Sequence, residues 1–273
     1  MGDADLVTSL RQAGVNRGDL VGLVVSPAGS LGLATADRAW AVPVGAGLPG
    51  PGPASGVGRA DEALRPRWAV WSGQTAAHLA GDGVRLATCW DIAAVHRLLF
   101  GGWRADPGWA WARLHGLDTE TMPAAGPLDL FGIDEGEADD PVAPDGYLRS
   151  EWAGGGWADS AGRIARWAVL ARAVAELQRD ALAAPPTPTD QSAVLADQSA
   201  VLADLPIALA DQPRALAAAR CESTAELLCA ELSADGLPMD RAVIEQVLAA
   251  LIGPRPRSEA EAAAWRSTRD AGV

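Results

Sequence analysis

The residues most suggestive of chemistry are an aspartate and a glutamate two positions apart, Asp118 and Glu120, in the string Asp-Thr-Glu-Thr. Paired carboxylates of this kind can ligate hard divalent cations such as Mg²⁺, which prefer oxygen ligands. However, the pair follows a Gly-terminated helical pattern, WAWARLHGL, and a three-residue match arises easily among 35 acidic residues. We therefore interpret residues 118–146 as an acidic, solvated loop and the carboxylate pair as a chance match.

Other single residues that could serve a site have simpler structural interpretations. Asp91 precedes an apolar helical pattern, so we expect it to cap that helix. His96 lies on the same helix without a carboxylate at close spacing to orient it as a base. We expect most tryptophans to pack in the core. The cysteines and histidines are too few and too scattered for a zinc site: Cys89, Cys221, Cys229, His78, His96 and His115.

Composition limits the classes of partner. The chain has 273 residues, 49% of them apolar, which is enough for a substantial core. Its 22 basic residues, all arginine, face 35 acidic ones, for a net charge of −13. Because affinity for nucleic acid depends on neutralising phosphates, the isolated chain should bind DNA poorly. It contains no apolar run long enough to cross a membrane and no basic-then-apolar signal, so we expect a cytoplasmic protein.

Apolar runs and turn residues predict a helix-rich α/β arrangement. A Gly- and Pro-rich loop is expected at 45–58. Strands are expected at 20–25, 31–34, 39–44, 68–71 and 84–88, and helices at 75–80, 91–100, 103–117 and 160–183. The alternation of strands and helices with short connections indicates a layered sheet with some parallel pairing.

A proline-rich break at 184–190 is the clearest linker, and a repeat follows it. QSAVLAD at 191–197 recurs unchanged at 198–204, with a decayed third copy at 205–211. The seven-residue period places Leu195, Leu202 and Leu209 on one helical stripe, although prolines interrupt it. We interpret the segment as a duplicated linker, and a coiled-coil contact remains the alternative.

Two blocks of the sequence resemble bacterial family A DNA polymerases, specifically the actinobacterial group of bifunctional 3′–5′ exonuclease/DNA polymerases. The first is DLVGLVV…AWAVPV followed by GVRLATCWDIAAVHRLLFGG, and the second runs from Glu222 to Asp240. The resemblance implies an RNase H-like, DnaQ-type exonuclease fold followed by an α-helical segment. It divides the chain into an exonuclease-like domain (1–183), a proline and heptad-repeat linker (184–219) and the helical start of the polymerase region (220–273).

The same resemblance implies that the catalytic groups are missing. The chain ends before the family's three polymerase motifs, and it has no lysine. The family's exonuclease holds two divalent ions with four carboxylates, but the strand at 20–25 carries no acidic pair. Thr75 stands in the second-motif aspartate position and Trp71 in the position of its asparagine. Trp167 and Ala171 stand in the tyrosine and aspartate positions of the third motif.

The resulting interpretation is a degenerate, inactive 3′–5′ exonuclease-like domain of a DNA replication or repair polymerase. We expect no catalytic, metal or cofactor residues in this chain, although Mg²⁺ serves the full-length family, and DNA as a partner only within the full-length polymerase. One alternative is an active metal-dependent exonuclease with displaced carboxylates, Asp118 and Glu120, with Tyr147 and Glu151 imitating the third motif. The other is a protein-interaction module.

Overall fold

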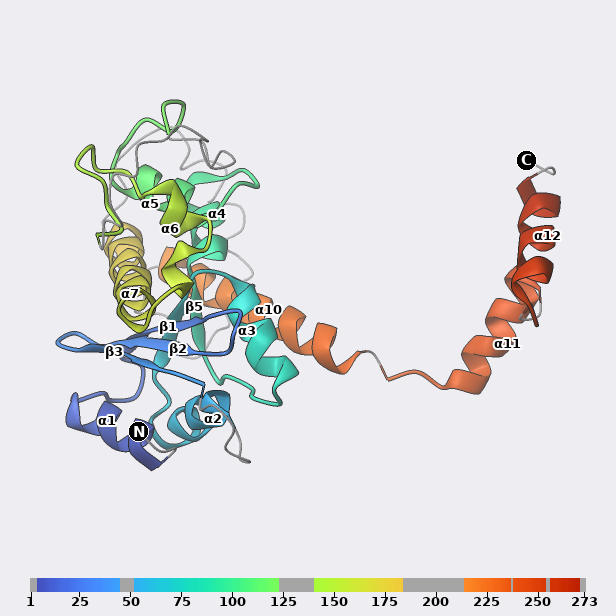
Figure 1. The fold of residues 1–273 in the computed structure, drawn as a ribbon, viewed down its shortest axis with the longest axis horizontal. Helices are drawn as coiled ribbons and strands as arrows, with labels where there is room; N and C mark the ends of the chain where they lie inside the picture. The colour runs from blue at the N-terminus through green and yellow to red at the C-terminus, as the bar shows by residue number, and fades with distance from the viewer. Residues whose placement is uncertain are drawn as a thin grey trace. The chain divides into compact units, whose positions relative to one another are not determined.

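The computed structural model describes residues 4–44, 52–122, 140–183, 214–236, 238–253 and 256–270, and the chain divides into two units between Ala234 and Asp235. The first unit is α/β, as expected, and is built on a mixed five-stranded sheet (Figure 1). Its strands are β1 (Leu20–Val25), β2 (Leu31–Ala34), β3 (Ala39–Val42), β4 (Arg67–Val70) and β5 (Cys89–Asp91). They lie in the order β3-β2-β1-β4-β5, with β1–β2 and β2–β3 antiparallel and β1–β4 and β4–β5 parallel.

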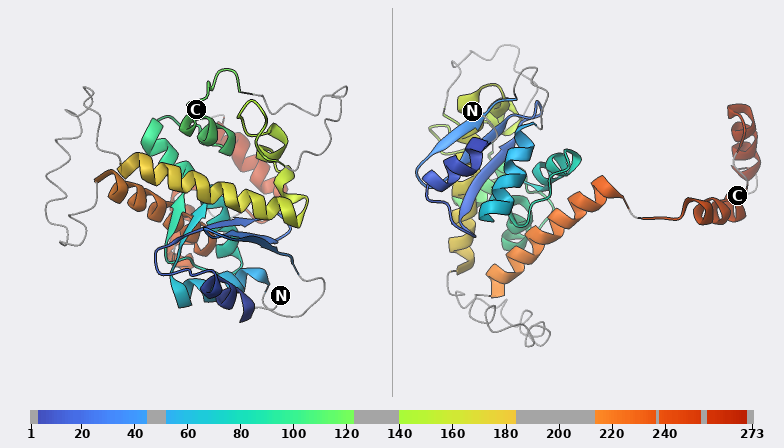
Figure 2. Two further views of the ribbon diagram at one scale, coloured as in Figure 1. Left: turned by 90° about the vertical axis from the view of Figure 1, so that its left-hand side faces the viewer. Right: turned by 90° about the horizontal axis from the view of Figure 1, so that it is seen from below.

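Helices cover both faces of the sheet. They are α1 (Ala4–Gln12), α2 (Pro53–Leu64), α3 (Gly73–Gly81), α4 (Ile92–Phe100), α5 (Pro107–Leu114), α6 (Ser150–Ala153), the 3₁₀ turn η1 (Gly156–Ala158), α7 (Ala161–Ala183) and α10 (Arg214–Asp235). Helix α7 crosses one face, and α1 and α2 lie on the other (Figures 1 and 2). Because side chains alternate along a strand, Leu20 and Val24 enter the core beneath α7 while Val21 and Leu23 enter the opposite core.

Helix α7 approaches the sheet unusually closely, at two glycines on neighbouring strands. A Cβ atom on Gly22 would lie 2.1 Å from the carbonyl oxygen of Ala168, and one on Gly32 would lie 2.3 Å from that of Ile164. Ile164 and Ala168 are one helical turn apart, so the same face of α7 rests on β1 and β2. The two glycines therefore set the distance and the angle at which α7 lies over the strands.

The edge strand β5 is covered by α10. The Ser223 hydroxyl accepts a hydrogen bond from the Asp91 backbone N–H at 3.0 Å, and the Ser223 carbonyl accepts one from the Cys89 thiol at 3.3 Å. Leu227 and Ala230 of α10 are buried in the same core cluster as Cys89. Since an uncovered edge strand presents unpaired backbone groups, α10 completes this side of the domain.

Most of the expected strands and helices are confirmed, but the strand expected at 84–88 is wrong. The strand in this region is β5, at Cys89–Asp91. The buried carboxylate of Asp61 explains the shift, because it accepts the Ala87 backbone N–H and the Trp68 indole N–H, both at 2.8 Å. The Asp61 carboxylate thus binds a backbone N–H group that would pair with a neighbouring strand if residues 84–88 formed one.

The loop expected at 45–58 is also wrong in its second half, where helix α2 begins at Pro53. Glycine disfavours helix, but Gly56 and Gly58 face the side chains of Leu6 and Val84, each 3.4 Å from the position of a Cβ atom. Tertiary packing therefore outweighs local propensity here. Residues 45–51 lie outside the described residues.

Helix α1 begins at Ala4, close to the N-terminus. Asp5 lies in α1, which buries Leu6 and Leu10 against the sheet, whereas Asp3 lies outside the described residues. The heptad repeat at 191–211 lies outside them too. None of the helices that the structure describes is long and apolar enough to cross a membrane.

The second unit, residues 235–273, contains the helices α11 (Arg241–Ile252) and α12 (Glu259–Asp270). The Asp240 carboxylate begins α11 by accepting the backbone N–H groups of Ala242 and Val243. Among the described side chains of α11 and α12, none is buried.

The close approach of α7 predicts that Gly22→Ala destabilises the first unit strongly. The added methyl group would overlap the Ala168 carbonyl, and overpacking of this kind costs about 1–3 kcal/mol or more. Urea unfolding followed by tryptophan fluorescence measures the loss. Gly81→Ala is the matched control, since a Cβ atom there meets nothing within 4 Å, and it should leave stability unchanged or raise it by up to about 1 kcal/mol. Equal stability of the two variants would contradict the packing argument.

Candidate functional site

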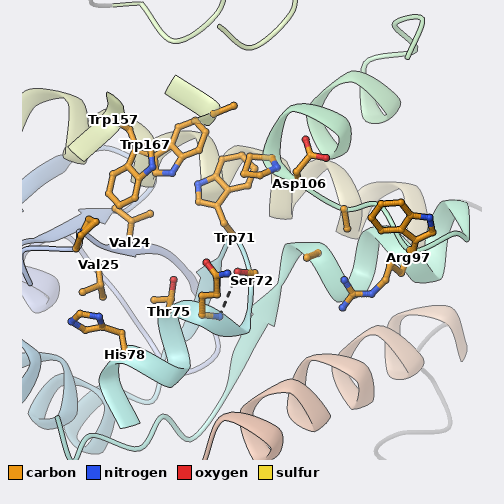
Figure 3. A pocket seen from close by; sticks show the side chains of 17 residues that line it. Val24, Val25, Trp71, Ser72, Thr75, His78, Arg97, Asp106, Trp157 and Trp167 are labelled. Carbon is orange, nitrogen blue, oxygen red and sulfur yellow. Dashed lines mark hydrogen bonds between the residues drawn. The ribbon is translucent and has the colours of Figure 1, made fainter. Parts of the chain in front are cut away.

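A pocket of about 610 Å³ opens at the carboxyl ends of β1 and β4 (Figure 3). Val24 and Val25 at the end of β1 form one side of it, and the residues that follow β4 form the floor. The parallel pairing of β1 and β4 brings these two chain segments together, because parallel strands end at the same edge of a sheet. Helices α3 and α4, the segment 103–107, and single residues of α6, η1 and α7 supply most of the remaining wall.

Tryptophan side chains dominate the inner wall. Trp71 stacks on Trp167 with ring centroids 4.5 Å apart, and Trp157 lies nearly parallel to Trp167 at 6.1 Å. Trp71 and Trp167 are only 7% and 2% exposed, so their rings belong to both the core and the pocket. The indole N–H of Trp71 is buried without a hydrogen-bond partner. At the rim, Trp103 is 87% exposed.

The polar groups of the pocket are few, and several are already engaged. The Ser72 hydroxyl begins α3 by accepting the Gln74 backbone N–H, and the Asp106 carboxylate begins α5 by accepting that of Trp109. Arg97 donates to Glu226 at 2.8 Å. Gln74, Thr75 and His78 of α3 are further polar residues of the lining.

The positions assigned to the family's exonuclease motifs largely converge on this pocket. The end of the strand at 20–25, Thr75 and Trp71 of the second motif, and Trp167 of the third motif all line it. Ala171, one turn further along α7, is fully buried in the adjacent core. Segments far apart in the sequence, at 24, 71–75 and 167, therefore meet at one place in the fold.

The donor atoms of the pocket do not fit a pair of divalent cations. Among the described residues that line the pocket, Asp106 is the single carboxylate, whereas hard cations need several oxygen ligands, usually carboxylates. Elsewhere in the described residues, no group of three or more His, Cys, Asp or Glu side chains could hold a metal ion. What the pocket offers chemically is a set of aromatic faces with a few polar groups, among them the Asp106 carboxylate and the Arg97 guanidinium.

Asp118 and Glu120 lie in an exposed turn after α5 and do not line the pocket. The Asp118 carboxylate accepts the Glu120 backbone N–H at 2.9 Å, which is a local turn contact. Tyr147 does reach this turn, since its hydroxyl donates to the Asp118 carbonyl at 2.9 Å. Glu151 instead pairs with Arg163 of α7. The remainder of the acidic loop, 123–139, lies outside the described residues.

His96 and Asp91 are both buried on or before α4. The expected cap is confirmed, because Asp91 Oδ1 accepts the Ala94 backbone N–H at 2.8 Å. Burial lowers the pKa of His96 to about 4, and Arg113 acts in the same direction, so the ring is neutral at pH 7. Neither of its nitrogens has a hydrogen-bond partner among the residues that the structure describes. His96 is therefore a neutral core residue that packs its ring on Phe100 at 4.9 Å.

The tryptophan expectation is confirmed for Trp68, Trp71 and Trp90, which are buried, whereas Trp103 is exposed. Sequence reasoning missed several pocket residues, among them Asp106, Trp157 and Arg97. Asp106 precedes a proline at the start of a helix, and that pattern was a usable signal for a cap. Nothing local in the sequence distinguished Trp157 from the other tryptophans.

Comparison with protein-family models, with curated proteins and with solved structures finds no match to this chain.

The buried carboxyl group of Asp91 predicts an unusual pH dependence of stability. Burial raises the pKa of Asp91 from 3.8 to about 7, and Glu226 adds to the rise, while the Ala94 N–H and Arg97 oppose it. Between about pH 4 and 7 the folded state therefore keeps a proton that the unfolded state loses, and the free energy of unfolding falls as pH rises through this window. Asp91→Asn keeps the cap acceptor without titrating.

Urea unfolding of both proteins at pH 4.5, 6 and 7.5 measures this effect. The difference in unfolding free energy should move in favour of Asp91→Asn with rising pH, by up to a few kcal/mol at about 1.4 kcal/mol per pKa unit. Asp180→Asn, at an exposed aspartate of α7, is the matched control and should track the wild type. A pH-independent difference for Asp91→Asn would contradict the prediction.

Proposed function

We propose that residues 1–183 are a degenerate, catalytically silent 3′–5′ exonuclease-like domain from the lineage of bacterial family A DNA polymerases. In this proposal the chain acts in the cytoplasm as a scaffold within a replication or repair polymerase, and it meets DNA only through the whole enzyme. The observation that carries the proposal is the convergence of Val24, Thr75 and Trp167 on one pocket whose lining has a single carboxylate.

The sheet supports an RNase H-like assignment. An RNase H-like fold is built on a five-stranded mixed sheet whose central first strand pairs antiparallel with the second and parallel with the fourth. The order β3-β2-β1-β4-β5 with these directions is compatible with that arrangement. The position of α7 over β1, β2 and β3 is consistent with a helix that carries the third motif.

The side chains at the positions assigned to the exonuclease motifs support a loss of nuclease activity. A nuclease of this kind needs negative charge at each motif to bind its two ions. Here the side chains are the valines that end β1, the hydroxyl of Thr75 and the methyl group of Ala171, none of which carries that charge. The Trp71–Trp167 stack also occupies part of the space between the motifs.

The second unit supports the part of the proposal that concerns the polymerase region. Three apolar side chains spaced by one turn on α11, Val243, Val247 and Leu251, are 53%, 52% and 75% exposed. Helices with apolar positions that lack a core of their own are typical of segments that pack into a larger domain. This agrees with the resemblance of residues 222–240 to the opening of a polymerase region.

The proposal predicts that the purified protein does not degrade DNA. Incubation with 3′-labelled single-stranded DNA and Mg²⁺ or Mn²⁺ should release label no faster than a sample without protein. Asp118→Ala/Glu120→Ala, prepared identically, is the matched control for contaminating nucleases and for the alternative site. Metal-dependent release that this double variant abolishes would replace the proposal with an active exonuclease at the exposed turn.

A second prediction tests the lineage separately from the loss of activity. The DNA that follows codon 273 in the source genome should encode, in frame, the family's polymerase motifs, which resemble DYSQIELR and HDE. Sequencing that region decides the point. A reading frame that continues without these motifs would contradict the polymerase assignment, whatever the nuclease assay shows.

A further inference from the structure

The pocket at the carboxyl ends of β1 and β4 has two walls of different chemistry. Trp157 and Trp167 lie on one side of it, and Thr75 and His78 of α3 lie on the other (Figure 3). Its volume of about 610 Å³ is in the range of pockets that hold small organic molecules, which are mostly apolar with a few placed polar groups. The pocket therefore has the size and the lining of a small-molecule site.

Trp157 is the tryptophan of the aromatic wall that is best placed to stack on a ligand. Its ring lies nearly parallel to that of Trp167, with centroids 6.1 Å apart, and Trp167 in turn stacks on Trp71 at 4.5 Å. Trp157 is half-buried, whereas Trp71 and Trp167 are buried. The wall thus holds the Trp157 ring in place while part of its surface stays accessible. A flat aromatic ligand would gain both burial and offset stacking there.

The opposite wall offers hydrogen bonds from the side chains of Gln74, Thr75 and His78. Gln74 and Thr75 lie within one turn of His78 on α3, so the three groups face the pocket together. Among the described residues, none forms a side-chain hydrogen bond or an ion pair with these three. An amide, a hydroxyl and an imidazole can each donate and accept. This wall can therefore bind a ligand edge that carries both donors and acceptors.

The carboxylate and the guanidinium of the described lining are already paired. Arg97 donates to Glu226 at 2.8 Å, and Asp106 pairs with Arg104 at 3.0 Å while it caps α5. The chain as a whole has a net charge of −13, which disfavours the approach of anions. The pocket therefore favours an uncharged ligand over a phosphate or a carboxylate.

We propose that this pocket binds a free, uncharged heteroaromatic molecule whose flat ring carries hydrogen-bond donors and acceptors on its edge, as a purine does. The ring stacks on Trp157, and its edge bonds to Thr75 and the neighbouring polar groups of α3. Binding needs no metal ion, because these contacts are stacking and neutral hydrogen bonds. The inference goes beyond the proposed function, and it depends on the pocket's own groups rather than on the lineage of the domain.

Titration of the full chain with adenosine in the presence of EDTA, followed by isothermal calorimetry, tests the site. The wild type should bind saturably with a Kd of about 1 mM or lower, and ribose should not bind. Trp157→Leu should bind adenosine about tenfold more weakly, because it removes the stacking partner. Trp265→Leu is the matched control, since Trp265 lies on α12 in the second unit and does not line the pocket. It should bind like the wild type.

Thr75→Val tests the polar wall with little change of volume. Loss of one neutral hydrogen bond should weaken adenosine binding by about threefold to tenfold, whereas Thr75→Ser keeps the hydroxyl and should bind like the wild type. Thr224→Val, at an exposed threonine of α10 outside the pocket lining, is the matched control and should have no effect. Circular dichroism checks that each variant is folded.

A short oligodeoxyadenylate decides whether the ring is free or part of a strand. We expect it to bind no more tightly than adenosine, because strand binding depends on cations that neutralise phosphates. Tighter binding of the oligonucleotide would overturn the proposal. So would the absence of saturable adenosine binding by the wild type, or equal binding by the wild type, Trp157→Leu and Thr75→Val. Since EDTA removes divalent ions here and the nuclease assay contains them, this proposal and the proposed function can fail separately.

Discussion

The contact between helix α7 and the sheet is the constraint on which the rest of the first unit depends. At Gly22 and Gly32 the helix backbone approaches the strands so closely that a side chain has no room. The small residues Ala168, Ala171 and Ala175 continue this contact into the core. Because α7 is straight and long, fixing it at two points also fixes Trp167 above the end of β1 and Gln178 beside β5. The aromatic wall of the pocket follows from this placement.

The wall of the pocket is built mainly from stacked indoles, which pack together without a bound ion. Carboxylates around a metal pair repel one another and need the cations to offset that repulsion. Stacked indoles need no ion, since dispersion and burial stabilise them directly. Trp71, Trp152 and Trp167 belong to the buried cluster that also contains Val24 and Ala168. In this protein the core and the pocket wall are thus continuous, and the cleft at the strand ends persists as part of a packed interior.

Local sequence patterns predict the regular strands and helix caps of this structure better than the segments whose structure depends on contacts distant in sequence. Strands β1, β2 and β4 are runs of apolar residues, and the cap at Asp91 follows directly from residue type, so local patterns sufficed. Helix α2 and the start of β5 depend on partners distant in sequence, Leu6 for Gly56 and Asp61 for Ala87, which no local pattern reveals. Trp71, Thr75 and Trp167, the positions singled out by the resemblance, line one pocket, whereas Trp157 and Asp106 reach it only through the fold.

The hydroxyl of Ser223 that meets the Asp91 backbone has a consequence for synthesis of the protein on the ribosome. Strand β5 is made early, but its outer edge is completed by α10, which is translated more than a hundred residues later. Until then, a nascent chain that has already formed the sheet presents an open edge able to pair with a neighbouring nascent chain. Because β5 has only three residues, few unpaired backbone groups are exposed at this edge. The brevity of β5 therefore limits misassembly while the chain grows, and α10 covers the edge only after it has been made.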